Sequence, residues 1–104
     1  MKDAAQKANL LMKALANENR LLLLCQLVEE KRSVGELASL LDLPQPVVSQ
    51  QLAVLSRDGF VSGTRTARTV HYELSGEAVK KIIAVLYELY CEPLDEHEER
   101  RNER

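Results

Sequence analysis

Residues 33–59 read SVGELASLLDLPQPVVSQQLAVLSRDG, and this stretch decides the fold. Ser33, followed three positions later by Glu36, has the pattern of a capping box, which starts a short helix. A short break follows, and Pro46 suits the first turn of a second helix, where its missing N–H costs nothing. Gly59 is a typical residue to stop that helix. The stretch therefore predicts two helices joined by a tight turn.

Further helices and a hairpin are expected on both sides of this pair. Apolar residues recur with the helical period before residue 33 and after residue 76, and residues 69–74 alternate as a strand with one buried face. Asn17 and Ser75 are the expected N-caps of the second and the last helix. The order α-α-α-α-β-β-α describes a mostly α winged helix-turn-helix whose wing is the β-hairpin. The predicted helices cover residues 4–15, 18–30, 34–41, 46–58 and 77–91, and the predicted strands cover residues 60–66 and 69–74.

Length and charge limit the class of protein. A chain of 104 residues is one domain, and its net charge is −2. Acidic residues are concentrated in residues 92–104, which hold six acids and three bases and which we predict to be a charged, disordered tail. Residues 1–91, the predicted folded domain, keep eleven bases against ten acids, or +1 (11 − 10). Binding to a nucleic-acid duplex needs only a local basic patch, so this balance does not exclude it.

Other classes of protein are disfavoured by what the sequence lacks. No apolar run is long enough to span a bilayer, and residues 1–7 are no signal peptide, so a cytoplasmic protein without a membrane partner is expected. Its thiols should then be reduced at rest. There is no Gly-rich phosphate loop and no Ser/His/Asp set, and we therefore expect neither an enzyme nor a bound cofactor.

The second helix of a helix-turn-helix enters the major groove of DNA. With Val48 and Leu52 buried, Gln50 lies on the opposite, outward face of residues 46–58. A glutamine can hydrogen-bond adenine through both ends of its amide, and Ser49 can reach a base or a phosphate. The alternative is that these are ordinary solvated side chains. The predicted DNA contacts of this region are Gln45, Pro46, Ser49, Gln50, Gln51 and Arg57.

Two arginines bracket the tip of the predicted hairpin. Arg65 and Arg68, together with neighbouring threonine hydroxyls, suit contacts to phosphates or insertion into the minor groove. Such contacts fix the register of a protein on DNA more than they read its sequence. A hairpin that is polar only for solubility is the alternative. His71 is expected to be a solvent-exposed side chain and no metal ligand.

Three motifs resemble those of the ArsR/SmtB family of homodimeric repressors. They are Leu15-Ala-Asn-Glu-Asn-Arg-Leu21, residues 33–38 together with 43–59, and the hairpin Ala67-Arg-Thr-Val-His-Tyr-Glu-Leu74. The resemblance covers roughly residues 8–91. It implies a homodimer whose interface is made by the first and the last helix. It also implies an inverted-repeat operator with half-sites about one helical turn apart. A transcriptional repressor with double-stranded DNA as its partner is therefore expected.

The chain departs from the metal-sensing members of that family. Residues 34–41 lack the CxC-type pair of the family's thiol site, and the last helix has no histidine for its zinc site. A site for Zn or Cu(I) needs three or four converging nitrogen or sulfur ligands. The remaining candidate ligands are Cys25, Cys91, His71 and His97, and we predict no metal site.

The two cysteines instead resemble those of the family's persulfide-sensing and thiol-redox branch, whose two reactive positions Cys25 and Cys91 match. This resemblance implies release from DNA when persulfide, polysulfide or an oxidant cross-links the pair, with reactive sulfur species as the inducer. Cys91, near a frayed helix end, is expected to attack first. Cys25, among apolar side chains that disfavour its thiolate, is expected to close the bridge. The resemblance implies that the bridge forms within one protomer, whereas the residues alone leave a bridge across the dimer open.

Two other functions stay open. The cysteines can be structural, as buried cysteines usually are, in a repressor that senses a metal ion or another small molecule, or that is regulated by competition for DNA. The winged helix can also be the scaffold of a protein-interaction module. A steep salt dependence distinguishes genuine duplex binding from that module.

Overall fold

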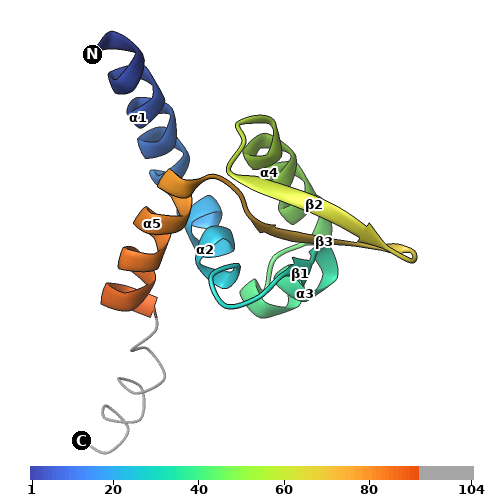
Figure 1. Cartoon of the computed structure of the whole chain (residues 1–104). Helices are drawn as coiled ribbons and strands as arrows, with labels where there is room; N and C mark the ends of the chain where they lie inside the picture. The colour runs from blue at the N-terminus through green and yellow to red at the C-terminus, as the bar shows by residue number, and fades with distance from the viewer. Residues whose placement is uncertain (92–104) are drawn as a thin grey trace, which may run out of the picture.

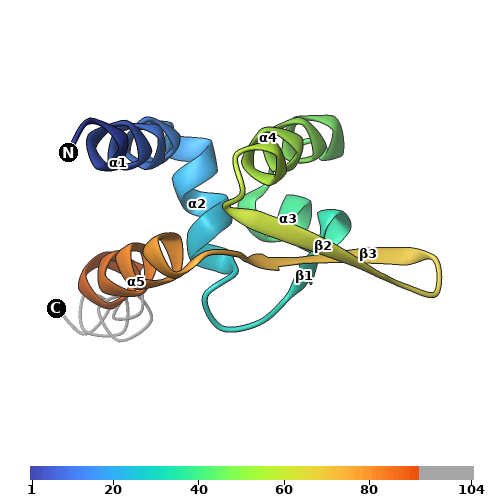
Figure 2. The ribbon, with the colours of Figure 1, turned by 45° about the horizontal axis from the view of Figure 1, so that its top comes forward.

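The structure, a computed structural model, has helices at one end and a projecting hairpin at the other. It describes residues 1–91, and of Cys91 the backbone alone; the predicted tail lies outside the described residues. Helices α1 and α5 lie at the end opposite the tip of the β2–β3 hairpin, and α2 lies between (Figure 1, Figure 2). The elements are α1 (Lys2–Leu15), α2 (Glu18–Gln26), β1 (Arg32–Ser33), α3 (Val34–Leu41), α4 (Gln45–Arg57), β2 (Val61–Thr66), β3 (Thr69–Leu74), α5 (Glu77–Leu86) and η1 (Tyr87–Cys91), the last a π-helical turn.

The predicted winged helix-turn-helix is confirmed, with one additional strand. β1 pairs antiparallel with β3, placing Arg32 opposite Tyr72 and Ser33 opposite His71, and the sheet order is β1-β3-β2. The two residues of β1 are too few to show an alternating pattern, so no local pattern indicated this strand. β1 joins the base of the wing directly to the start of α3.

The core is centred on α2 and α4. Leu23 and Leu24 of α2, and Leu52 and Leu55 of α4, have no exposed surface. Each such burial contributes on the order of 2 kcal/mol before entropy costs. Val48, Leu52 and Leu55 lie on one side of α4, and their complete burial fixes which face of that helix reaches solvent.

Two predicted caps are confirmed, and one is wrong. The Asn17 side chain accepts the N–H of Arg20 at 3.1 Å. Ser33 and Glu36 form the reciprocal capping box, in which Glu36 N–H donates to Ser33 Oγ at 3.1 Å and Ser33 N–H donates to Glu36 Oε1 at 2.8 Å. Ser75 caps nothing: the N-cap of α5 is Gly76, at φ 94°, with no side-chain bond. Glycine adopts this backbone conformation without a Cβ clash.

Several predicted boundaries shift. α2 ends at Gln26 instead of residue 30, because the chain turns after Leu27 and the guanidinium of Arg32 donates to the Gln26 carbonyl at 2.8 Å. That bond stabilises the C-terminal carbonyls of α2 from beyond the turn. α1 begins two residues before the predicted start, α4 begins at Gln45 and β2 at Val61.

Candidate nucleic-acid interface and thiol site

The outward face of α4 carries most of the predicted DNA contacts. Val48, Leu52 and Leu55 are completely buried on the inward side. This anchoring leaves one polar stripe in solvent, starting at the N-terminal end of the helix. The exposed members of the predicted set on α4 are Gln45, Pro46, Ser49, Gln50 and Arg57.

Gln51 differs from the rest of that set. Its side chain is half-buried, and its Oε1 is a buried atom that accepts no hydrogen bond within the described residues. A buried amide oxygen that accepts no hydrogen bond lowers the stability of the fold. Gln51 would have to rotate outward to meet a base, whereas Gln50 already faces solvent.

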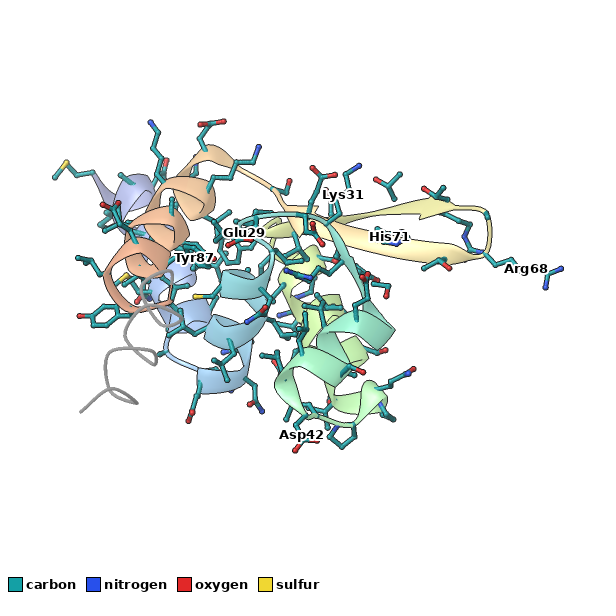
Figure 3. All side chains as sticks on the ribbon, turned by 90° about the horizontal axis from the view of Figure 1, so that it is seen from below. Glu29, Lys31, Asp42, Arg68, His71 and Tyr87 are labelled. Carbon is teal, nitrogen blue, oxygen red and sulfur yellow. The ribbon has the colours of Figure 1, made fainter. Side chains whose placement is uncertain are left out.

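The wing presents its two arginines at the end of the hairpin. Thr66 pairs with Thr69, so Ala67 and Arg68 form the tip, and Ala67 takes a left-handed backbone at φ 58°. Arg65 and Arg68 are exposed, and Figure 3 shows Arg68 extending outward beyond the strands. The third arginine, Arg57, lies 3.3 Å from Asp58 with 72% of its side chain exposed, so that ion pair is loose.

His71 is less exposed than predicted. It is half-buried, opposite Ser33 on one side and Thr64 on the other. Hydrogen bonding by the backbone N–H and the side chain of Ser33 holds the pKa of Glu36 below its usual range, and the charges of His71 and Arg32 contribute less in the same direction. His71 therefore belongs to the junction of β1, α3 and the wing.

The two cysteines lie on different elements, Cys25 on α2 and Cys91 at the end of η1. Cys25 lies in α2, is 4% exposed and belongs to the core cluster, so its predicted apolar surroundings are confirmed. For Cys91 the structure describes the backbone alone, so the predicted exposure of its side chain stays a prediction. No three His, Cys, Asp or Glu side chains among the described residues could together hold a metal ion.

A long-range contact near the two cysteine-bearing segments was not predicted from the sequence. The Tyr87 hydroxyl, at the start of η1, donates to the Glu29 carboxylate just beyond α2. The two residues are 58 positions apart, and the sequence near either one carries no signal that they meet.

An apolar groove lies between α1 and α5. Its volume is about 640 Å³, and its lining includes Leu10, Met12 and Ile82. Large apolar side chains are exposed on the same two helices and on η1: Leu10, Met12, Ile82, Val85 and Leu89. A cluster of this kind is typical of a surface that is covered in an assembly.

None of the helices in the described part is long and apolar enough to cross a bilayer.

Known proteins match this arrangement. A family model described as "Bacterial regulatory protein, arsR family" matches residues 17–62. The transcriptional activator HlyU of Vibrio cholerae is 49% identical over 92 residues, 88% of this chain and 85% of that one. A solved structure of reduced HlyU from V. cholerae has a TM-score of 0.83, at 49% identity, covering 88% of this chain and 96% of that one.

Two further relatives extend the comparison. The biofilm growth-associated repressor of Agrobacterium fabrum is 40% identical over 93 residues, 89% of this chain and 80% of that one. The homodimeric winged helix-turn-helix DNA-binding domain of Mb0332 from Mycobacterium bovis has a TM-score of 0.75 at 26% identity, covering 92% of this chain and 88% of that one.

Proposed function

This chain belongs to the ArsR family of bacterial transcriptional regulators, and we propose that it is a homodimeric repressor whose DNA affinity is controlled by Cys25 and Cys91. It is a DNA-binding regulator and not an enzyme. The repressor form binds an inverted-repeat operator while both cysteines are reduced. The observation that carries the DNA-binding part is the exposed polar stripe of α4 above a fully buried inward face.

The apolar groove between α1 and α5 supports the homodimer. Apolar side chains on these two helices are unusually exposed for a monomer, Met12 at 61% and Val85 at 52%. The M. bovis relative of similar fold is homodimeric. A second copy of this chain that packs through the same face would hold two α4 helices in a fixed separation, as an inverted repeat requires.

Gln50→Ala tests the proposed reading of bases. Loss of a bidentate contact should weaken operator binding by about 1–3 kcal/mol and relax the preference at one base pair in each half-site. Binding to scrambled duplex should change little, and Lys81→Ala on α5 is the control. Equal weakening on operator and scrambled DNA would contradict a base contact by Gln50.

The proposed inducer chemistry is a sulfur bridge between Cys25 and Cys91. One thiolate attacks the terminal sulfur of a low-molecular-weight persulfide, RSSH, and RSH leaves, so that cysteine becomes a persulfide. Closing the bridge removes two electrons, and a second RSSH accepts them. The balance is two protein thiols plus two RSSH giving one protein trisulfide, two RSH and one hydrogen sulfide. Peroxide would instead give a disulfide and two waters.

The burial of Cys25 supports the order of attack. A thiol that is 4% exposed reaches a bulky persulfide poorly, so the first attack falls to Cys91 at the end of η1. One solved structure of the V. cholerae relative is described as reduced HlyU. The bridge would fix α2 to η1, next to the proposed dimer interface, and thereby bias the spacing of the two α4 helices. A coupling of about 1–3 kcal/mol changes operator affinity roughly 5- to 150-fold.

Intact mass after exposure to glutathione persulfide, or separately to peroxide, tests the thiol part. With persulfide, wild-type protein should gain one or more sulfur atoms, lose two hydrogens and leave neither cysteine open to capping. Cys25→Ser and Cys91→Ser should form no intramolecular bridge and should stay on the operator. If both wild-type thiols remain open to capping, Cys25 and Cys91 are structural.

Regulation by competition for DNA is the second candidate. It is favoured by the name of the V. cholerae relative, a transcriptional activator, because a DNA-binding protein can activate by excluding a repressor from the same site. In that case operator affinity would be the same for reduced and oxidised protein.

Titration of the reduced protein with Zn²⁺ tests the remaining possibility, which is sensing of a metal ion. Metal binding would then change operator affinity at a fixed stoichiometry.

A further inference from the structure

A hydrogen bond from Tyr87 to Glu29 joins the end of the last helix to the end of α2. The Tyr87 hydroxyl donates to Oε1 of Glu29. Figure 3 shows the two labelled side chains side by side where α2 and α5 approach each other. Neither residue has a part in the proposed DNA contacts or in the sulfur chemistry itself.

This bond lies close in sequence to both cysteines. Cys25 is four residues before Glu29, and Cys91 is four residues after Tyr87. The N–H of Val28 donates to the Cys25 carbonyl at 3.3 Å, so the backbone forms a turn between Cys25 and Glu29. On the other side, a single π-helical turn connects Tyr87 to Cys91. The hydrogen bond is therefore a direct side-chain link between the two cysteine-bearing segments.

Tyr87 is also where the C-terminal helix stops packing on the core. Leu86 and Tyr87 are half-buried against the core cluster. Leu89 and Tyr90, later in the same turn, are 61% and 69% exposed in the protomer. π-helical turns are rare and occur frequently at functional sites. Contacts of Tyr87 consequently determine where this turn lies relative to α2.

We infer that Tyr87 is a positioning residue for the sulfur bridge and acts through its hydrogen bond to Glu29. The inference rests on the proposed function. Attack by the first thiolate on a persulfide needs only access to solvent, whereas closing the bridge needs the Cys25 and Cys91 segments at a fixed separation. The hydrogen bond holds η1 at the end of α2 and favours closure. Losing it should slow closure about fivefold, the effect of one net hydrogen bond, and leave the first attack unchanged.

Matched variants separate the hydroxyl from the ring. Tyr87→Phe keeps the packed ring and removes the donor, Glu29→Ala removes the acceptor, and Glu29→Gln keeps an acceptor oxygen. Tyr90→Phe removes a hydroxyl from the same turn and is the control. Reduced protein is mixed with glutathione persulfide, capped at intervals and weighed, which gives separate rates for first modification and for bridging. We expect slow bridging in Tyr87→Phe and Glu29→Ala, and wild-type rates in Glu29→Gln and Tyr90→Phe.

Hydrogen exchange of the reduced protein tests the hydrogen bond without the sulfur chemistry, and the bridging rates distinguish the failure of this inference from that of the proposed function. Amides of residues 87–91 should exchange about fivefold faster in Tyr87→Phe than in Tyr90→Phe, while α3 and α4 should be unchanged. If wild type bridges and Tyr87→Phe bridges equally fast, the inference is overturned and the sensing proposal stands. If wild type forms no bridge, both are overturned, whatever the exchange rates show.

Discussion

Arg20 joins two helices with one side chain. Its Nε donates to the Ala14 carbonyl at 3.1 Å and its Nη2 to the Lys13 carbonyl at 3.2 Å, so it stabilises the end of α1 from the first turn of α2. Arg20→Met should lower the free energy of unfolding by about 1–2 kcal/mol, measured by urea denaturation. Arg57→Met, which removes only an exposed ion pair, should change it by less than about 0.5 kcal/mol. Equal effects would contradict the capping role of Arg20.

Glu36 makes stability depend on pH. Its pKa is lowered in the folded protein by hydrogen bonds from Ser33, so the folded state favours the carboxylate. This contribution is fully present above the ordinary value of 4.5 and is lost as pH falls through the lower folded value. Glu36→Gln should therefore lose less stability than wild type over that acidic range, as followed by thermal unfolding. Ser33→Ala, which removes the side-chain hydroxyl and keeps the backbone N–H, should move the pKa of Glu36 upward in a carboxyl NMR titration.

Gly63 sets the packing of the wing at the scale of the element. A Cβ at this position would lie 2.9 Å from Val70 Cγ1 and 3.0 Å from Tyr72 Cε1, both on the paired strand β3. Gly63→Ala should force those side chains to move, and overpacking of this kind costs about 1–3 kcal/mol. We expect weaker DNA binding and shifted wing resonances in an NMR spectrum with α4 unchanged. Ser62→Ala on the same strand is the control. Equal DNA binding by both variants would contradict a role of the close packing at Gly63 in DNA binding.

Elements with a strong local signal could be predicted from the sequence, and those that depend on distant partners could not. The capping box of Ser33 and the apolar face of α4 are local, and both were predicted. β1 exists only because Arg32 and Ser33 pair with β3, about 40 residues away in sequence. The end of α2 was misplaced for the same reason, since the bond from Arg32 to Gln26 requires the chain to turn back.

The candidate site was predictable to a similar degree. The outward stripe of α4 follows from helical periodicity, whereas the half-buried state of Gln51 depends on how neighbouring elements pack. The contact between Tyr87 and Glu29 joins residues 58 positions apart, and no pattern in one sequence marks such a pair.

The predicted interface is locally basic although the whole molecule is acidic. The chain carries a net charge of −2, yet its wing holds Arg65 and Arg68 with no acidic residue between them. Arg65→Gln and Arg68→Gln should each reduce the slope of log K against log salt by about one and weaken operator and scrambled DNA alike. Lys80→Gln on α5 should leave the slope unchanged. A slope unaffected by both wing variants would contradict phosphate contacts by the wing.

The proposed assembly can be tested on matched apolar positions. Val85 on α5 and Leu40 on α3 are both 52% exposed, but only Val85 lies on a helix that borders the apolar groove. Val85→Asp should shift the protein to a monomer in sedimentation, because burying an unpaired carboxylate is unfavourable. Leu40→Asp should stay dimeric. A dimer that tolerates Val85→Asp would place the interface elsewhere.

Operator affinity before and after bridging tests the central claim most directly. Wild-type protein, fully reduced or bridged by glutathione persulfide and confirmed by mass, would be titrated onto operator DNA at one fixed salt concentration. The account predicts affinity at least about fivefold lower for the bridged form, restored by reduction, and no change for Cys91→Ser treated in the same way. Equal affinity of the reduced and the bridged protein would contradict it.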